Sequence, residues 1–126
     1  MRLDMTAALG ALLIAVATSG LAGSFSGASY SALDLLSPCQ EADNDARWGE
    51  AAETECEQYI MGFADALREV GMTGPDTSIC PPELNTADEI RWAFMRWVHA
   101  DFSARKGMSA ADALLATLRD SFACSN

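Results

Sequence analysis

Four cysteines that follow a short apolar segment constrain this chain more than any other feature. The sequence opens with Met1-Arg2, is apolar from Ala7 to Ala17, and continues with small and polar residues as far as Ser24. A charged start, a short apolar stretch and small residues are the layout of a secretory signal, and the apolar run is too short for an ordinary bilayer-spanning helix. We therefore predict that residues 1–28 are a signal peptide, cleaved between residues 22 and 28.

The cysteines all lie beyond this segment, at Cys39, Cys56, Cys80 and Cys124. An even number of cysteines in an exported chain predicts disulfide bonds rather than a redox site. A zinc site is disfavoured because no two cysteines have the Cys-x₂-Cys spacing. The mature chain, residues 29–126, has the size of one small domain with a limited core, so cross-links matter for its stability.

The charge of the chain excludes some classes of partner. It holds 8 Lys and Arg against 18 Asp and Glu, and the segment before Ser29 carries one of each, so the mature chain keeps a net charge of −10. Nucleic acids and anionic membranes bind basic surfaces, so we predict that the mature protein binds neither. Seven acids and one base, Arg47, fall within Glu41–Glu57. This acidic segment is interpreted either as a solvated loop and helix start or as a docking surface for a basic partner.

Hydrophobic periodicity predicts an all-α fold, a small four-helix domain with one short and three longer helices. The predicted helices span Ala32–Ser37, Ala51–Val70, Thr86–Arg105 and a last segment that opens at Ser109. Ser31 with Asp34, and Thr86 with Glu89, have the spacing of capping boxes at two helix starts. Pro38 is expected to stop the first helix, and Gly71 is expected to end the second in a left-handed conformation. The second helix carries one apolar stripe at helical period, made of Cys56, Tyr59, Ile60, Phe63, Ala64, Leu67 and Val70.

The order of the helices predicts one of the three possible cysteine pairings. Cys39 ends the first helix and Cys56 lies near the start of the second, so a helical hairpin brings them together. Cys80 precedes the third helix and Cys124 follows the fourth, and their short connection implies an antiparallel pair with these two ends side by side. We predict the bonds Cys39–Cys56 and Cys80–Cys124.

No catalytic motif is recognisable in the sequence. His99 is the only histidine, and Asp101, two residues away, points to another side of a helix. No free thiol remains if both disulfides form, and no phosphate-binding loop or nucleophile elbow is present. We predict that the protein is not an enzyme and uses neither a cofactor nor a metal.

The third predicted helix is apolar on two sides. Its first side holds Ile90, Ala93, Phe94, Trp97 and Val98, and its second side holds Trp92, Met95, His99 and Phe102. A helix that is apolar all round either lies at the centre of the core or contacts another molecule, and Trp and Met are enriched at interfaces. The second side is therefore a candidate interface, with burial in the core as the alternative.

The order of several short motifs resembles the Rap/Tai immunity proteins of type VI secretion systems. The motifs are Leu35-Leu36, Cys39, Cys56-x-x-Tyr59-Ile60-x-Gly62-Phe63-x-Asp65, Cys80-Pro81 and the terminal Phe122-Ala123-Cys124. The resemblance covers nearly the whole mature chain. Two departures stand out: the family often ends in Phe-Pro-Cys where Ala123 stands here, and it usually has a proline where this chain has Ala100-Asp101-Phe102.

The resemblance implies a small periplasmic helical protein that acts as a homodimer and blocks the cleft of a cognate peptidoglycan amidase effector. Within the motifs, the residues interpreted as structural are Tyr59, Gly62, Phe63, Asp65, Pro81 and Phe122. The competing interpretation is a small disulfide-bonded periplasmic chaperone of acid stress, or another periplasmic binding protein. Seventeen acids in the mature chain make the chaperone physically possible, because their protonation would loosen the fold and expose apolar surface.

Overall fold

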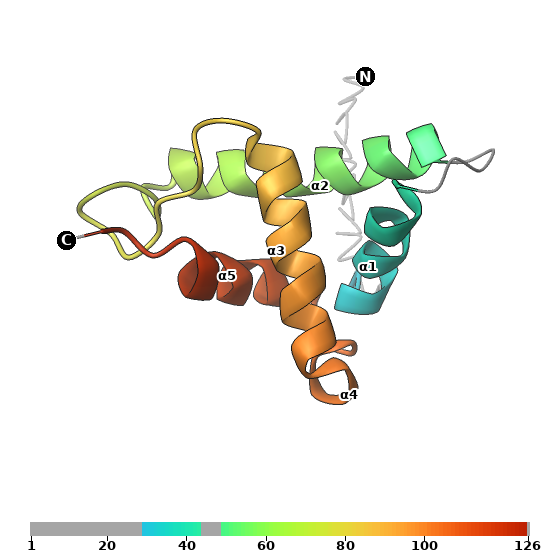
Figure 1. Cartoon of the computed structure of the whole chain (residues 1–126). Helices are drawn as coiled ribbons and strands as arrows, with labels where there is room; N and C mark the ends of the chain where they lie inside the picture. Colours follow the sequence, from blue (N-terminus) through green and yellow to red (C-terminus); the bar gives the residue numbers. More distant parts are fainter. Residues whose placement is uncertain (1–28, 44–48, 126) are drawn as a thin grey trace, which may run out of the picture.

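Five helices build the part of the chain that the computed structural model describes, residues 29–43 and 49–125 (Figure 1). The predicted signal peptide lies outside the described residues. The helices are α1 (Ala32–Glu41), α2 (Gly49–Glu69), α3 (Thr86–Ala100), α4 (Phe102–Arg105) and α5 (Ala110–Ser121). Within the described ranges the only β-type pairings are two isolated bridges, Ser31 with Ser109 and Ile79 with Ala123. The predicted all-α class is confirmed.

Helix α1 begins as predicted and ends later than predicted. The Ser31 hydroxyl accepts a hydrogen bond from the Asp34 amide at 3.1 Å, and the Asp34 carboxylate accepts one from the Ser31 amide at 2.8 Å, which completes the capping box. Pro38 does not stop the helix, which continues to Glu41. A proline inside a helix leaves the carbonyl four residues earlier without its donor. Here the Tyr30 hydroxyl shares its single proton between that carbonyl, of Asp34, at 3.1 Å and the Glu55 carboxylate at 2.8 Å, which partly replaces the lost donor.

Helix α2 carries the predicted apolar stripe. Cys56, Ile60, Ala64 and Leu67 are buried along one side of it. The helix ends at Glu69, and Val70, which the periodicity assigned to the stripe, is 68% exposed. Gly71 follows with φ of 71°, the left-handed conformation that was expected to terminate this helix.

The long third helix predicted from the sequence is two helices, α3 and α4, separated at Asp101. Asp101 leaves the helical conformation, with φ of −147°, and its carboxylate accepts a hydrogen bond from the Ala104 amide at the start of α4. The Arg105 guanidinium turns back, donates to the Trp97 carbonyl and lies 3.9 Å from the centroid of the Trp97 ring. It therefore supplies a donor to one of the carbonyls that the end of α3 leaves unpaired.

The predicted capping box at the start of α3 is also wrong. The Thr86 hydroxyl donates to the Pro82 carbonyl at 2.7 Å, so it binds the preceding loop instead of the helix. The N-cap is Asn85, which has φ of 50° and makes no side-chain cap hydrogen bond. Asparagine tolerates this left-handed conformation better than most residues do.

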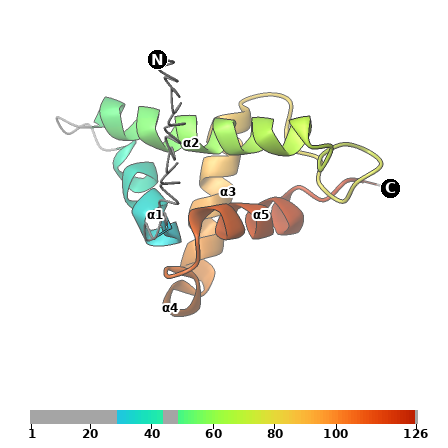
Figure 2. The same cartoon turned by 180° about the vertical axis from the view of Figure 1, so that it is seen from behind.

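The core lies where α1, α2, α3 and α5 meet. Its largest fully buried side chains are Leu35, Leu36, Ile60, Ile79, Ile90, Phe94, Val98, Leu114, Thr117 and Leu118, with Cys39 and Cys56. Helix α3 crosses α5 steeply in both views, so the expected antiparallel pair does not form (Figures 1 and 2). Steep crossings occur when the side-chain ridges of one helix pack into the grooves of another.

Both predicted disulfides, Cys39–Cys56 and Cys80–Cys124, are present. The second pairing is right although the antiparallel argument for it is wrong. Cys80 meets the end of the chain because the loop before α3 runs beside it: the Cys80 amide donates to the Phe122 carbonyl at 2.8 Å, and the Cys124 amide donates to the Ser78 carbonyl at 3.4 Å. This short antiparallel contact brings the two cysteines together.

Candidate protein-docking site

The four candidate interface residues lie on one side of α3 and on the adjoining α4. Trp92 is 42% exposed, Phe102 is 38% exposed and His99 is also exposed, whereas Met95 is 7% exposed. The rings of His99 and Phe102 stack with their centroids 6.0 Å apart. The structure thus places three of the four side chains at the surface and Met95 beneath them.

A hollow of about 420 Å³ opens beside Trp92, and we call it the Trp92 hollow. It is lined by Gln40, Asp43, Trp92, Met95, Arg96 and His99. One wall comes from the end of α1 and the turn after it, and the other wall comes from α3. The Gln40 side-chain nitrogen and His99 Nε2 lie 2.8 Å apart and join the two walls. The amide nitrogen can only donate, so His99 Nε2 is the acceptor in this contact.

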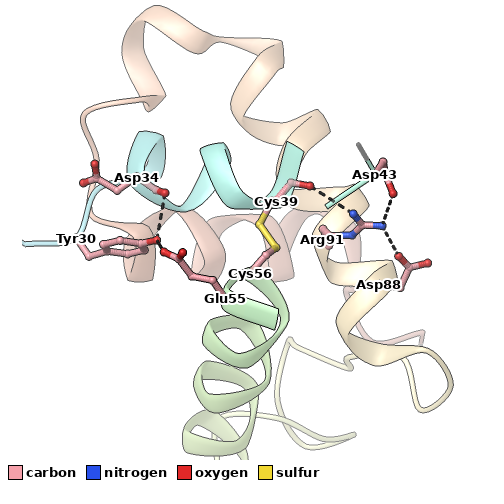
Figure 3. The surroundings of a disulfide bond; sticks show 8 residues. All are labelled: Tyr30, Asp34, Cys39, Asp43, Glu55, Cys56, Asp88 and Arg91. Carbon is pink, nitrogen blue, oxygen red and sulfur yellow. Dashed lines mark hydrogen bonds and ion pairs between the residues drawn. A yellow bond between two sulfur atoms is a disulfide. The ribbon is translucent and has the colours of Figure 1, made fainter. Parts of the chain in front are cut away.

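Beneath this hollow lies Arg91, which sequence reasoning missed. Its side chain is 5% exposed and donates to the Cys39 carbonyl at 3.3 Å, to Asp43 at 3.1 Å and to Asp88 at 2.8 Å (Figure 3). Burial lowers the pKa of Arg91, but the hydrogen bonds that Arg91 donates to Asp88 and Asp43 outweigh it and hold the pKa above its ordinary value. The available sequence signal was the spacing of Asp88 and Arg91, three residues apart on one helix.

A second hollow, which we call the α1–α2 groove, has a volume of about 860 Å³ and lies over part of the acidic segment. It is lined by Tyr30, Leu33, Asp34, Ser37, Pro38, Glu41, Ala51, Ala52 and Glu55. The Tyr30 hydroxyl donates to Glu55 at 2.8 Å. Burial and the Glu55 carboxylate both raise the pKa of Tyr30. Residues 44–48, including Arg47, lie outside the described residues, and the docking role of the acidic segment stays a prediction.

The family-motif residues are distributed between the core and the surface. Tyr59, Phe63 and Phe122 are partly buried and pack against the core, and Pro81 is half-buried. Exposed Asp65 pairs with Arg68 at 2.8 Å within α2. Gly62 is exposed, and a Cβ atom added there would meet nothing within 4 Å, so nothing in the structure explains a glycine at this position.

The surroundings of the single histidine offer no assembled catalytic pair. His99 contacts Gln40 and Phe102, while Asp101 caps α4. Across residues 29–43 and 49–125, no three His, Cys, Asp or Glu side chains gather where they could hold a metal ion. No helix in these same ranges combines the length and the apolar character that crossing a membrane requires.

These features define a small helical protein, cross-linked by two disulfides, with an exposed aromatic face beside a hollow. The family model of the Rap1a immunity proteins matches residues 31–124, a segment that includes all five helices and both disulfides. The chain belongs to the Rap1a immunity protein family, which confirms the resemblance found in the sequence. This membership supports an immunity role and implies binding to a partner effector. Searches of curated proteins and of solved structures found no match.

Proposed function

We propose that this protein is a periplasmic immunity protein. It binds a peptidoglycan amidase effector of a type VI secretion system, occludes its cleft and so protects the producing cell. The match of the Rap1a family to residues 31–124 is the observation that carries this proposal. The amidase target and the occlusion mechanism rest on the resemblance of the motifs around Cys56, Cys80 and Cys124 to the Rap/Tai proteins.

The state of the cysteines supports the proposed location. Cys39, Cys56, Cys80 and Cys124 are all disulfide-bonded, and none of the described cysteines is free. Disulfides form and persist in oxidising compartments such as the bacterial periplasm. The signal-peptide layout of residues 1–28 leads to the same compartment, which is also where peptidoglycan is hydrolysed.

The exposed aromatic face supports a function by binding. Exposed Trp92 lines the Trp92 hollow, in which Met95 lies under the surface, and exposed Phe102 stacks on His99, another lining residue. Tryptophans near the centre of an interface often contribute most of the binding energy. We propose that Trp92, Met95, His99 and Phe102 form a contact with a second copy of the chain or with the effector, and that the protein acts as a homodimer.

A protection assay tests the proposed function in cells. A type VI amidase effector from the producing organism is exported to the periplasm of a laboratory strain, alone or with the full chain, and lysis is followed by optical density. We expect lysis with the amidase alone and growth when the full chain is present. A matched control carries the same chain without residues 1–28, which stays in the cytoplasm and is expected to give no protection.

Three results would contradict parts of the proposed function. Lysis that the full chain does not change would refute the immunity role against this amidase. If the purified protein instead captures many unfolded proteins, and only at acidic pH, then the acid-stress chaperone is the correct interpretation. A monomer at micromolar concentration in light scattering would refute the homodimer.

A further inference from the structure

Arg91 is the one charged side chain that is buried in the described ranges 29–43 and 49–125. Removing a guanidinium from water costs free energy, and apolar side chains of similar size often give equal or greater stability at such positions. Stability alone therefore does not explain an arginine here. The geometry of its contacts suggests what it does.

The guanidinium joins two helices at one point. Its Nη1 donates to the Cys39 carbonyl in the last turn of α1, and its Nη2 donates to Asp43 just beyond that helix and to Asp88 in the first turn of α3 (Figure 3). Among the described residues, its Nε is buried and has no hydrogen-bond partner. Since Cys39 forms a disulfide with Cys56, the contact of Arg91 with the Cys39 carbonyl lies next to the covalent link between α1 and α2.

These contacts lie directly behind the Trp92 hollow. Asp43, which lines one wall, accepts a hydrogen bond from Arg91, and the guanidinium carbon lies 5.1 Å from the ring centroid of Trp92, which lines the other wall. Arg91 therefore contacts both walls. A lysine would keep the charge but would lack the planar fork of donors that reaches several acceptors at once.

We infer that Arg91 is a positioning residue, which holds the α1 wall of the Trp92 hollow against its α3 wall and so sets the shape of the docking site. The inference rests on the proposed function, in which this hollow contacts a protein partner. Its pKa lies above the ordinary value for arginine, so Arg91 keeps its charge at any pH the periplasm experiences.

Nuclear magnetic resonance tests this role in the oxidised mature chain. Two signals report the hollow: the cross-peak between the Gln40 side-chain amide and the His99 ring, and the indole resonance of Trp92. In Arg91→Lys and Arg91→Met we expect both disulfides and native circular dichroism, loss of the cross-peak and a shifted indole resonance. The control Arg68→Met removes an exposed arginine that also pairs with an aspartate three residues away, and it should change neither signal.

The inference is overturned if folded Arg91→Lys and Arg91→Met keep both signals. Should Arg91→Met unfold, Asp43→Ala decides the question, because it removes one acceptor of Arg91 at a half-exposed position. A weakened cross-peak in folded Asp43→Ala supports the positioning role, and an unchanged cross-peak refutes it.

Protection against the amidase separates this inference from the proposed function. If Trp92→Glu leaves protection intact, the proposed contact surface is wrong, and the two resonance signals alone decide the role of Arg91. If Trp92→Glu abolishes protection while folded Arg91→Met keeps it in full, the surface is right and the positioning role of Arg91 is wrong.

Discussion

Among the described Phe, Trp and Tyr side chains, Trp92 and Phe102 are the two most exposed, at 42% and 38%. The first apolar side of α3 is buried: Ile90, Phe94 and Val98 lie in the core. The periodicity of the sequence distinguished these two sides but could not tell which of them the core would cover. That choice depends on where α1 and α5 pack, which is a property of the whole fold.

A charge at Trp92 tests the meaning of its exposure. We expect Trp92→Glu to leave the chain folded, with a melting temperature within a few degrees of the parent, since the side chain is 42% exposed. Self-association or binding to the effector should be lost, because a carboxylate buried at an interface without a partner is strongly unfavourable. Circular dichroism and light scattering measure the two effects separately.

The matched control is Leu84→Glu, which places the same charge at an apolar side chain that is 81% exposed elsewhere. It should leave both folding and association unchanged. If Trp92→Glu unfolds the isolated chain, Trp92 belongs to the core and the interface hypothesis fails.

The capping box at Ser31 leads to a second prediction at this scale. Hydrogen bonds from the Ser31 side chain and from its backbone amide hold the pKa of Asp34 below its ordinary value. Because the pKa of Asp34 is lower in the folded chain than in the unfolded chain, where it is near 4, the ionised carboxylate stabilises the fold above that pH. This stabilisation is lost as the pH falls through the pKa of the folded state.

Ser31→Ala should cost about 1 kcal/mol at pH 7, as loss of an N-cap usually does. The difference in unfolding free energy between parent and variant, measured by urea titration, should shrink below pH 4. A difference that stays constant to pH 2 would contradict the assignment.

At the scale of the elements, the sequence predicted where helices exist better than where they begin and end. The capping box of α1 and the terminating Gly71 were predicted correctly, because both signals act within a few residues. The extension of α1 through Pro38 depends on Tyr30, and the break after α3 involves Arg105, which contacts Trp97 eight residues earlier. Such partners are not visible in local patterns. The same holds for the contacts of Arg91 with Asp43, just beyond α1, and with Cys39, in α1, which are 48 and 52 residues away.

The support of Pro38 by Tyr30 can be measured. Tyr30→Phe removes the hydrogen bonds to the Asp34 carbonyl and to Glu55, and we expect it to lower the unfolding free energy by about 1–2 kcal/mol. In the Pro38→Ala background the loss should be smaller, since the new backbone amide can donate to the Asp34 carbonyl. A double-mutant cycle with urea unfolding gives the coupling. Additive effects would show that Tyr30 does not compensate for the proline.

For the molecule as a whole, the two disulfides add covalent links to the packing of the helices. Cys39–Cys56 joins α1 to α2, and Cys80–Cys124 joins the loop before α3 to the end of the chain. A domain of about 100 residues has a stability margin of only about 5–15 kcal/mol, so a few kcal/mol from each bond is a large share of it. The stability of the fold therefore depends on oxidising conditions, under which the two disulfides persist.

The lengths of the closed loops give each bond a different expected contribution. The cysteines are 17 residues apart in the first bond and 44 in the second, for which the chain-entropy model gives about 3 and about 4 kcal/mol. Replacing both members of a pair by alanine should therefore cost more for Cys80–Cys124 than for Cys39–Cys56. Guanidinium unfolding of the two double variants measures this order, and a reversed order would show that native-state contacts outweigh loop closure.

We propose that this protein acts by binding one amidase in stoichiometric amounts. The most direct measurement is a titration of a type VI amidase effector from the producing organism with the oxidised mature protein, with release of peptide from purified peptidoglycan as the readout. Inhibition should rise linearly and become complete at a fixed molar ratio, and Trp92→Glu should shift or abolish the curve while Leu84→Glu follows the parent. Undiminished hydrolysis at a large molar excess of the folded, oxidised protein would contradict the account.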